Sequence, residues 1–136
     1  MHRETLKISS AGRSFIDITR KVGDIVARAS ADDGLCNVFV LHTSASLVIT
    51  ENADPNVLED LETVISDLAP DGDLRYTHTA EGPDDMSAHI RSILTQTSLS
   101  LPVVSGALQL GSWQGLFLWE HRARPHMRKV VVSVLD

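Results

Sequence analysis

Histidines and carboxylates gather in one polar stretch, residues 76–89, which holds two of the six histidines and three carboxylates. A glycine–proline pair breaks the chain there, and either of the two aspartates that follow can cap a new helix. On that helix Asp85 and His89 are four residues apart and share a face. His78 and Glu81 lie just before the helix, so all four groups can converge. A polar loop with a capped helix after it has the same composition and stays the alternative.

The candidate metal ligands are His42, His78, His89, Asp84 and Asp85. Imidazole is a common ligand of zinc-like metals, and three protein ligands plus water is a catalytic pattern. Carboxylates can instead hold Mg²⁺ against a pyrophosphate. The spacing matches no standard local zinc motif, so structural histidines remain possible.

Two further segments can bind an anion. His42 ends an apolar run and is followed by small hydroxyl residues, including Thr43 and Ser44, which leave backbone N–H groups accessible. The same residues can simply satisfy a turn. Basic residues between Arg122 and Lys129 form either a solvated loop or a phosphate site. No nucleophile elbow and no Walker loop is present.

Hydrophobic periodicity predicts an α+β fold, a single compact domain spanning residues 1–136 with mostly antiparallel strands. Helical spacing predicts three helices near residues 18–30, 55–69 and 85–95, with Asp17 and Asp54 as caps of the first two. Alternating or continuous apolar runs predict strands at residues 3–9, 14–16, 35–42, 47–50, 99–104, 107–110, 115–120 and 128–135. The runs at 35–42 and 47–50 are close enough for a hairpin or a bulged corner.

The second and third predicted helices have apolar stripes, and we expect the stripe of the third helix to be buried. The stripe of the second helix consists of Val57, Leu58, Leu61, Val64, Ile65 and Leu68, opposite an acidic face without an assigned function. The third helix presents Met86, Ile90, Ile93 and Leu94, with His89 beside them. Trp113 lies in a glycine-bracketed turn and is more typical of packing than of ligand stacking.

Composition narrows the class of protein. The chain has 136 residues, 43% hydrophobic and 22% charged, with a formal net charge of −6. This acidic balance, without a Lys/Arg run, argues against nucleic acid as a partner. No apolar run is long enough to span a bilayer and no secretory segment follows Met1. The single cysteine, Cys36, excludes an intramolecular disulfide. We therefore expect a cytoplasmic protein without a membrane partner.

Four motifs in one order resemble the YjbQ-like family over nearly the whole chain. They are His42-Thr43-Ser44-Ala45-Ser46-Leu47, Glu51-Asn52-Ala53-Asp54-Pro55, Tyr76-x-His78-x-x-Glu81-Gly82-x-Asp84-Asp85-Met86-x-x-His89, and Gly106-x-Leu108-x-Leu110-Gly111-x-Trp113-Gln114-Gly115. The first motif carries Ser44 and Ser46 where relatives often have threonine or alanine. Pro83 replaces a common acidic residue, which removes one charge from the candidate metal site.

The resemblance implies a homotrimer with a secondary thiamine-phosphate synthase activity. That reaction joins a hydroxymethylpyrimidine diphosphate to a thiazole phosphate and releases pyrophosphate, so the implied partner is a small phosphorylated metabolite. The resemblance implies a site built from His42, His78, Glu81, Asp84, Asp85 and His89. Of these, His42, His78, Glu81 and His89 are the candidate catalytic residues. The candidate substrate-binding residues are Thr43, Ser44, Asn52, Asp54, Trp113 and Gln114.

Two alternatives to the synthase remain open. The first is a hydrolase or lyase that uses a zinc-like ion held by His42, His78 and His89. The second is a trimeric module that binds a phosphorylated metabolite without turnover. For the enzymatic hypotheses the expected cofactor is a divalent metal, Mg²⁺ or zinc-like. Metal content separates the first alternative from the synthase, because tight binding of a transition metal favours the hydrolase or lyase.

Overall fold

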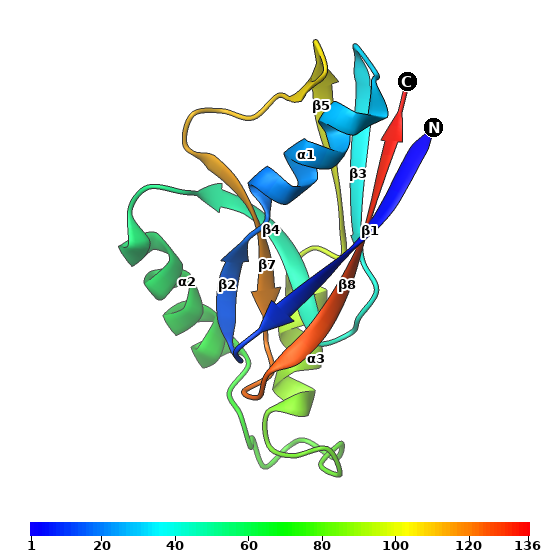
Figure 1. The fold of residues 1–136 in the computed structure, drawn as a ribbon. Helices are drawn as coiled ribbons and strands as arrows, with labels where there is room; N and C mark the ends of the chain where they lie inside the picture. Colours follow the sequence, from blue (N-terminus) through cyan, green and yellow to red (C-terminus); the bar gives the residue numbers. More distant parts are fainter.

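Eight strands and three helices make up the fold in the computed structural model, which describes residues 1–136 (Figure 1). The strands are β1 (His2–Ser10), β2 (Ser14–Asp17), β3 (Gly34–Val40), β4 (Ala45–Glu51), β5 (Ser98–Val104), β6 (Ala107–Leu108), β7 (Gln114–Glu120) and β8 (His126–Leu135). The helices are α1 (Thr19–Ala29), α2 (Pro55–Leu68) and α3 (Asp85–Leu94). The predicted α+β class and all three predicted helices are confirmed.

The strands form two antiparallel sheets. The larger sheet has the order β1-β8-β3-β5-β6, and the smaller has the order β2-β7-β4. The last strand, β8, lies between β1 and β3, with Lys129 opposite Lys7 and Val132 opposite Val38. The two chain termini therefore lie side by side at one end of the larger sheet (Figure 1).

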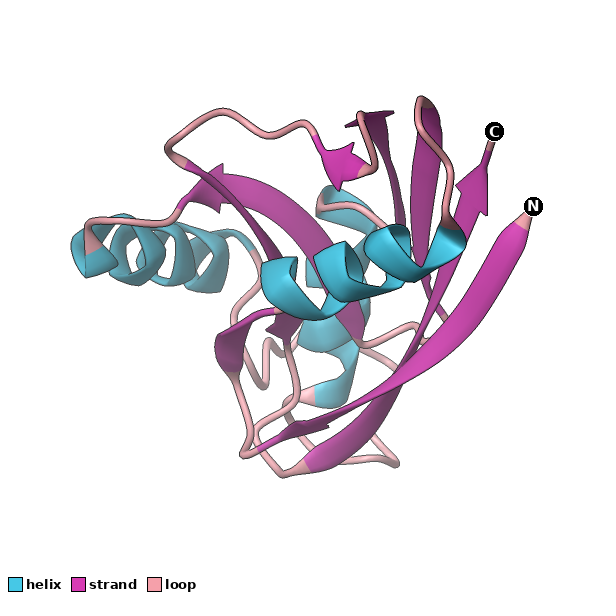
Figure 2. Ribbon diagram, turned by 45° about the horizontal axis from the view of Figure 1, so that its top comes forward, coloured by secondary structure: helices cyan, strands magenta, loops and turns pink.

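The hydrophobic core joins α1 to both sheets. Its 18 buried residues form one cluster that includes β3 and β8 of the larger sheet and β4 and β7 of the smaller. Helix α1 contributes Val22, Ile25 and Val26, all fully buried at the helical spacing that the sequence predicts. Figure 2 shows α1 crossing one face of the larger sheet. This single core agrees with the absence of any linker in the sequence.

The chain turns a corner between β3 and β4 and does not form the hairpin that their spacing allows. β3 pairs with β5 and β8, whereas β4 pairs with β7 in the other sheet. Residues 41–44 carry the chain from one sheet to the other. The corner places His42 and Thr43 at the junction of the sheets, on the side where α3 packs.

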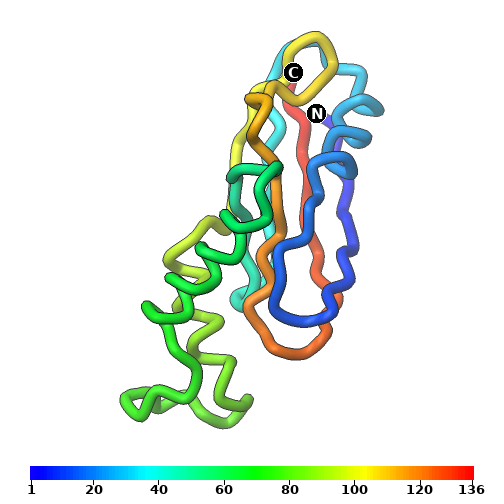
Figure 3. The backbone as a smooth tube through the Cα atoms, turned by 90° about the vertical axis from the view of Figure 1, so that its left-hand side faces the viewer, coloured from blue at the N-terminus to red at the C-terminus, as the bar shows by residue number.

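Helix α2 projects from the body of the molecule (Figure 3). It begins at Asp54, whose carboxylate accepts a hydrogen bond from the Asn56 N–H at 2.9 Å, as the sequence predicts. Of the predicted apolar stripe, Val57, Leu58 and Leu61 are half-buried. Only Ile65 of α2 is buried, while Val64 and Leu68 are 58% and 65% exposed, because the helix meets the rest of the chain along a narrow line.

Helix α3 differs from the prediction that its apolar stripe is buried. Ile93 and Leu94, which we expected to be buried, are 81% and 54% exposed. The buried residues of the helix are Asp85, Ser87, Ala88, Arg91 and Ser92. The reason is that the surface beneath α3 is polar: Arg91 donates to Glu62 and Ser66 of α2. None of the three helices combines the length and apolar character that crossing a membrane requires.

Candidate functional site

Three side chains with metal-binding atoms meet at the start of α3. The ligand atoms of His78, Asp85 and His89 all lie within 4.8 Å of one another. Both imidazoles approach the same carboxylate oxygen, since His78 Nε2 is 2.7 Å and His89 Nε2 is 3.2 Å from Asp85 Oδ2. Asp85 is buried, and the two rings lie nearer the surface. The i,i+4 spacing in α3 sets the Asp85–His89 pair, as the sequence predicts.

The contact of His89 Nδ1 determines which ring nitrogen carries a hydrogen. His89 Nδ1 is 2.9 Å from the Thr43 carbonyl oxygen, which can only accept, so Nδ1 carries a hydrogen. A neutral ring then presents an unshared electron pair at Nε2. That pair faces the Asp85 carboxylate, which also only accepts. A proton or a cation between Nε2 and Oδ2 satisfies both groups. Histidines that bind metals commonly show this arrangement, with the other ring nitrogen donating to a carbonyl.

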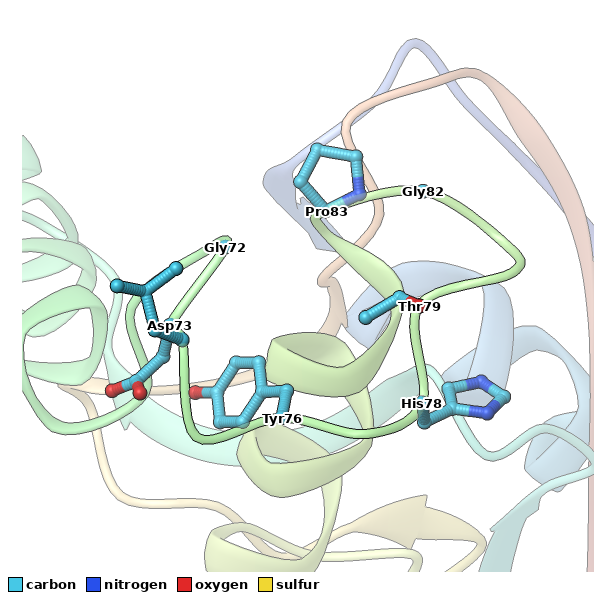
Figure 4. Close-up of a pocket in the computed structure, with 8 residues that line it drawn as sticks. Gly72, Asp73, Tyr76, His78, Thr79, Gly82 and Pro83 are labelled. Atoms are coloured by element: carbon cyan, nitrogen blue, oxygen red, sulfur yellow. The ribbon is translucent and has the colours of Figure 1, made fainter.

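His78 comes from a surface loop whose ends are tied together. The Gly72 N–H donates to the Pro83 carbonyl oxygen at 2.9 Å, which closes residues 72–83 into one excursion. Figure 4 shows Tyr76 and His78 along this loop, with Gly82 and Pro83 on its returning part. The loop encloses a hollow of about 380 Å³ with His78 in its wall. Asp85 and His89 do not line this hollow, and Figure 4 shows the His78 ring turned away from Tyr76 and Thr79.

Arg122 holds the carboxylates of the site in place. Its Nη1 donates to Asp85 Oδ1 at 2.9 Å, its Nε donates to Asp84 Oδ2 at 2.9 Å, and its Nη2 donates to the Glu81 carbonyl oxygen at 3.0 Å. Burial opposes ionisation of Asp85, but the hydrogen bond from His78 and the charges of His89 and Arg122 outweigh it, so the pKa of Asp85 lies below its usual value. Asp85 thus stays ionised with Oδ2 directed at the histidines.

Arg122 is a residue that the sequence reasoning missed, because we expected a solvated or phosphate-binding segment there. Asp84 departs from the prediction in a related way. It occupies the N-cap position of α3 without capping, since its Oδ2 accepts from Arg122 and from the Ala123 N–H. Asp84 is therefore not among the three clustered ligands. The sequence did offer a signal for this contact. Two adjacent acidic residues start α3, and an arginine follows the apolar strand β7 by two residues.

His42 lies on the other side of His89. The two rings line a hollow of about 340 Å³ that also includes Thr43, Ser92 and Thr97. His42 Nε2 accepts a hydrogen bond from the Lys129 backbone N–H at 2.8 Å. Burial, followed by the charge of nearby Arg128, lowers the pKa of His42, which favours the neutral ring. His42 therefore meets His89 across the hollow and does not join the cluster of three.

The two hydroxyl residues after His42 have different roles, since Thr43 lies at the site and Ser44 is bound to the buried Arg128. Thr43 gives its carbonyl oxygen to His89 and lines the hollow. Ser44 is buried, and its hydroxyl and carbonyl oxygens accept from Arg128. Arg128 in turn pairs with Glu120, which is fully buried. Glu81 is exposed in a hollow of about 350 Å³ that it shares with Arg122 and Arg124.

The remaining predicted substrate-binding residues lie at the opposite end of the smaller sheet. Asn52 N–H donates to the Trp113 carbonyl oxygen at 3.0 Å, and Gln114 Oε1 accepts from the Gly111 N–H at 2.8 Å. Asp54 caps α2, and Trp113 is 66% exposed. The seven residues of β4 separate this end from Thr43, a span of roughly 20 Å at 3.3 Å per residue. Within one chain the two groups do not share a pocket.

The fold and the cluster define a small α+β protein with two histidines and one carboxylate poised around a common point. The chain belongs to the YjbQ-like family, because the model described as "UPF0047 protein YjbQ-like" matches residues 4–136. It is 53% identical to the UPF0047 protein sll1880 of Synechocystis over 98% of this chain and 90% of that one. It is 40% identical to the UPF0047 protein YjbQ of Salmonella typhimurium over 98% and 96% of the two chains.

The fold is shared with a solved structure. The conserved hypothetical protein TT1486 of Thermus thermophilus is 38% identical and superposes with a TM-score of 0.86, covering 97% of this chain and 99% of that one. The family resemblance read from the four motifs is therefore confirmed. None of these names specifies a reaction, so the thiamine-phosphate synthase activity stays a prediction.

Proposed function

We propose that this protein is a metal-dependent enzyme centred on His78, Asp85 and His89 that acts on a small phosphorylated metabolite. The observation that carries the proposal is the orientation of His89. Its Nδ1 is committed to the Thr43 carbonyl oxygen, and its Nε2 faces a carboxylate that has no hydrogen to give. Either a second proton on the ring or a bound cation completes this pair, and the approach of His78 to the same carboxylate oxygen favours the cation.

The donor set favours a zinc-like ion over Mg²⁺. Two imidazoles suit zinc and related metals, whereas Mg²⁺ prefers oxygen ligands. Only Asp85 Oδ2 is turned toward the histidines, because Arg122 takes both Asp85 Oδ1 and Asp84 Oδ2. Three protein ligands leave a position for water, and an ion bound there would make that water a nucleophile near neutral pH. This supports a hydrolase or lyase.

Other side chains have proposed roles beside this centre. Glu81 is exposed in the hollow that it shares with Asp84 and Arg122, and it is the candidate to take up or release a proton. His42 can donate through Nδ1 across the hollow that it shares with His89, because its Nε2 already accepts. Arg124 shares the Glu81 hollow and offers a guanidinium to a phosphate group.

Thiamine-phosphate synthesis is the second candidate, and the four family motifs support it. The reaction needs a neutralised diphosphate leaving group. The hollow bordered by Arg122 and Arg124 is a candidate place for that group, but the carboxylates available for Mg²⁺ are fewer than the sequence suggested.

Metal content is the first test. The purified protein should contain about one zinc-like ion per chain, and His78→Gln, Asp85→Asn or His89→Gln should each lose it while remaining folded. His2→Gln is the matched control, since His2 bonds only to Glu4 on the surface. Protein that binds no transition metal, or variants that keep it, would refute the metal centre.

The reaction is then tested by product. Metal-loaded protein is incubated with a panel of phosphorylated metabolites, and ³¹P NMR reports any cleavage. In parallel, the hydroxymethylpyrimidine diphosphate and thiazole phosphate pair is assayed for thiamine phosphate and pyrophosphate. Cleavage that His89→Gln abolishes supports the hydrolase or lyase, and condensation that requires added Mg²⁺ supports the synthase. Ligand protection against unfolding without turnover would establish the binding module instead.

A further inference from the structure

One face of the larger sheet is covered by no other part of the chain. In β1, β3 and β8 the even-numbered residues point into the core beneath α1, and the odd-numbered residues point the other way. Leu35, Phe39 and Leu135 on this outer face are 51%, 42% and 43% exposed. Leu41, which continues the face beyond β3, is 49% exposed. Apolar side chains gathered on one open sheet face are typical of an interaction surface.

The charge of this outer sheet face has a single sign. Arg3, Lys7 and Lys129 are exposed on it, and Lys7 lies directly opposite Lys129 across the β1–β8 pair. The outward positions of β1, β3, β5 and β8 include no Asp or Glu. A protein of net charge −6 thus has one face that carries only positive charge.

The segment around α2 has the opposite character. Residues 51–74 contain eight carboxylates, of which Glu62, Asp71 and Asp73 pair with arginines elsewhere in the chain. Glu59, Asp60 and Asp67 are exposed on α2. The same helix exposes Val64 and Leu68, and Leu74 after it is fully exposed. α2 is therefore an acidic surface with apolar side chains that nothing in the chain covers.

We propose that the α2 surface of one subunit binds the outer sheet face of the next, head to tail. The two surfaces match in both respects, since each exposes apolar side chains and their charges are opposite. Because the two surfaces differ, the contact is heterologous and closes into a ring when the rotation per subunit allows. The proposal names the surfaces that the expected homotrimer uses, and it rests on that expectation.

The contact also borders the candidate site. Leu41 lies on the outer sheet face, its N–H donates to the Lys129 carbonyl oxygen, and His42 follows it in the chain. A subunit seated on this face therefore lies beside the hollow between His42 and His89. Its neighbour forms part of the surroundings of that hollow.

Charge reversal on each surface, separately and together, tests the pairing. Lys7→Glu/Lys129→Glu reverses two of the three charges of the sheet face, and Glu59→Lys/Asp60→Lys reverses two of the exposed charges of α2. None of these four side chains makes a hydrogen bond within the chain, so we expect the variants to fold, and circular dichroism checks this. Light scattering should give three times the 14.8 kDa chain mass for the unchanged protein. Each double variant should associate roughly 100-fold more weakly, because like charges then face one another.

The quadruple variant is the decisive one. It carries both reversals, keeps the net charge of the unchanged protein and should again form the ring. Arg20→Glu/Lys21→Glu and Asp24→Lys/Asp32→Lys make the same charge changes away from both surfaces and should not affect assembly. An unchanged protein that is monomeric refutes both the ring and the pairing. A ring that both double variants keep, or that the quadruple variant does not recover, refutes this pairing alone. Metal content is read on every variant and should not change, which separates this proposal from the metal centre.

Discussion

Helices α1 and α3 both pack against β-strands, but they turn chemically opposite sides inward. α1 buries Val22, Ile25 and Val26, whereas α3 buries Asp85, Arg91 and several small residues. α1 has only to fill the core. α3 has to hold Asp85 and His89 in a fixed relation to Thr43 and Arg122, which requires hydrogen bonds with defined directions.

The difference shows where the stability of the site originates. A buried polar group is costly unless it is paired, so a helix that buries charges depends on each partner being present. Arg91 has its partners in Glu62 and Ser66, and Ser87 donates to the Asp71 carboxylate. Arg13 of the β1–β2 turn donates to the same Asp71. These bonds fasten α3, α2 and the loop that carries His78 into one unit.

The largest expected effect comes from breaking the polar contacts of α3. Arg91→Met should lower the free energy of unfolding by about 3 kcal/mol, because it removes one partner of a largely buried ion pair. Urea unfolding measures it. Arg28→Met on α1 is the matched control: Arg28 pairs with Glu4 in solvent, and its loss should be a small fraction of that value. Equal losses for the two variants would remove the contrast between the helices.

Acid should lower the stability of the folded protein through the buried His121. His121 is fully buried, and burial followed by the charge of Arg91 lowers its pKa from 6.5 to about 3. The folded protein therefore binds fewer protons than the unfolded chain between these values. Stability from this group is complete above pH 6.5 and is lost as the pH falls, by about 2 kcal/mol between pH 6.5 and 5. Urea unfolding at several pH values measures the slope, and His121→Gln should flatten it. A slope unaffected by that change would place the titration elsewhere.

Bound metal should hold the loop of residues 72–83 against α3. Arg75 is exposed in the loop of residues 72–83 and offers a trypsin site. Because His78 joins this loop to α3, added Zn²⁺ should slow cleavage after Arg75 at least about tenfold. His78→Gln should remove the protection. Cleavage after Arg28 in α1 serves as the internal reference, and mass spectrometry follows both products. Equal slowing at both sites would show that Zn²⁺ inhibits trypsin or stabilises the whole fold, and would contradict a local effect on the loop.

The sequence predicted most of the fold because local rules decide most of it. Alternation identified the strands, and Asp54 capped α2 as its position indicates. β3 and β4 belong to different sheets because each pairs with a strand far away in the sequence. The short distance between them in the sequence does not predict this. The site followed the same division. Asp85 and His89 are joined by helical spacing, but the Arg122 contact and the separation of His42 from the cluster arise only from the corner and the β7–β8 turn.

The α3 stripe shows why periodicity alone misled. Ile90, Ile93 and Leu94 recur at helical spacing, and the rule assumes that the apolar side of a helix meets the core. Here Ile93 and Leu94 point outward and Ile90 is only half-buried, because Arg91, Ser87 and Asp85 have partners beneath the helix. The apolar stripe therefore gave the wrong orientation for its C-terminal part.

The smallest expected effect tests that orientation. Ile93→Ala should change the free energy of unfolding by less than about 0.5 kcal/mol, because the side chain is 81% exposed and alanine favours the helix. Ile25→Ala in α1 is the matched control. It should cost about 2–5 kcal/mol, since Ile25 is fully buried in the core. Urea unfolding of both variants at two protein concentrations completes the measurement. A loss above about 1 kcal/mol for Ile93→Ala that grows with concentration would mean that a second subunit covers this side of α3. A loss independent of concentration would mean that α3 packs with its apolar stripe inward after all.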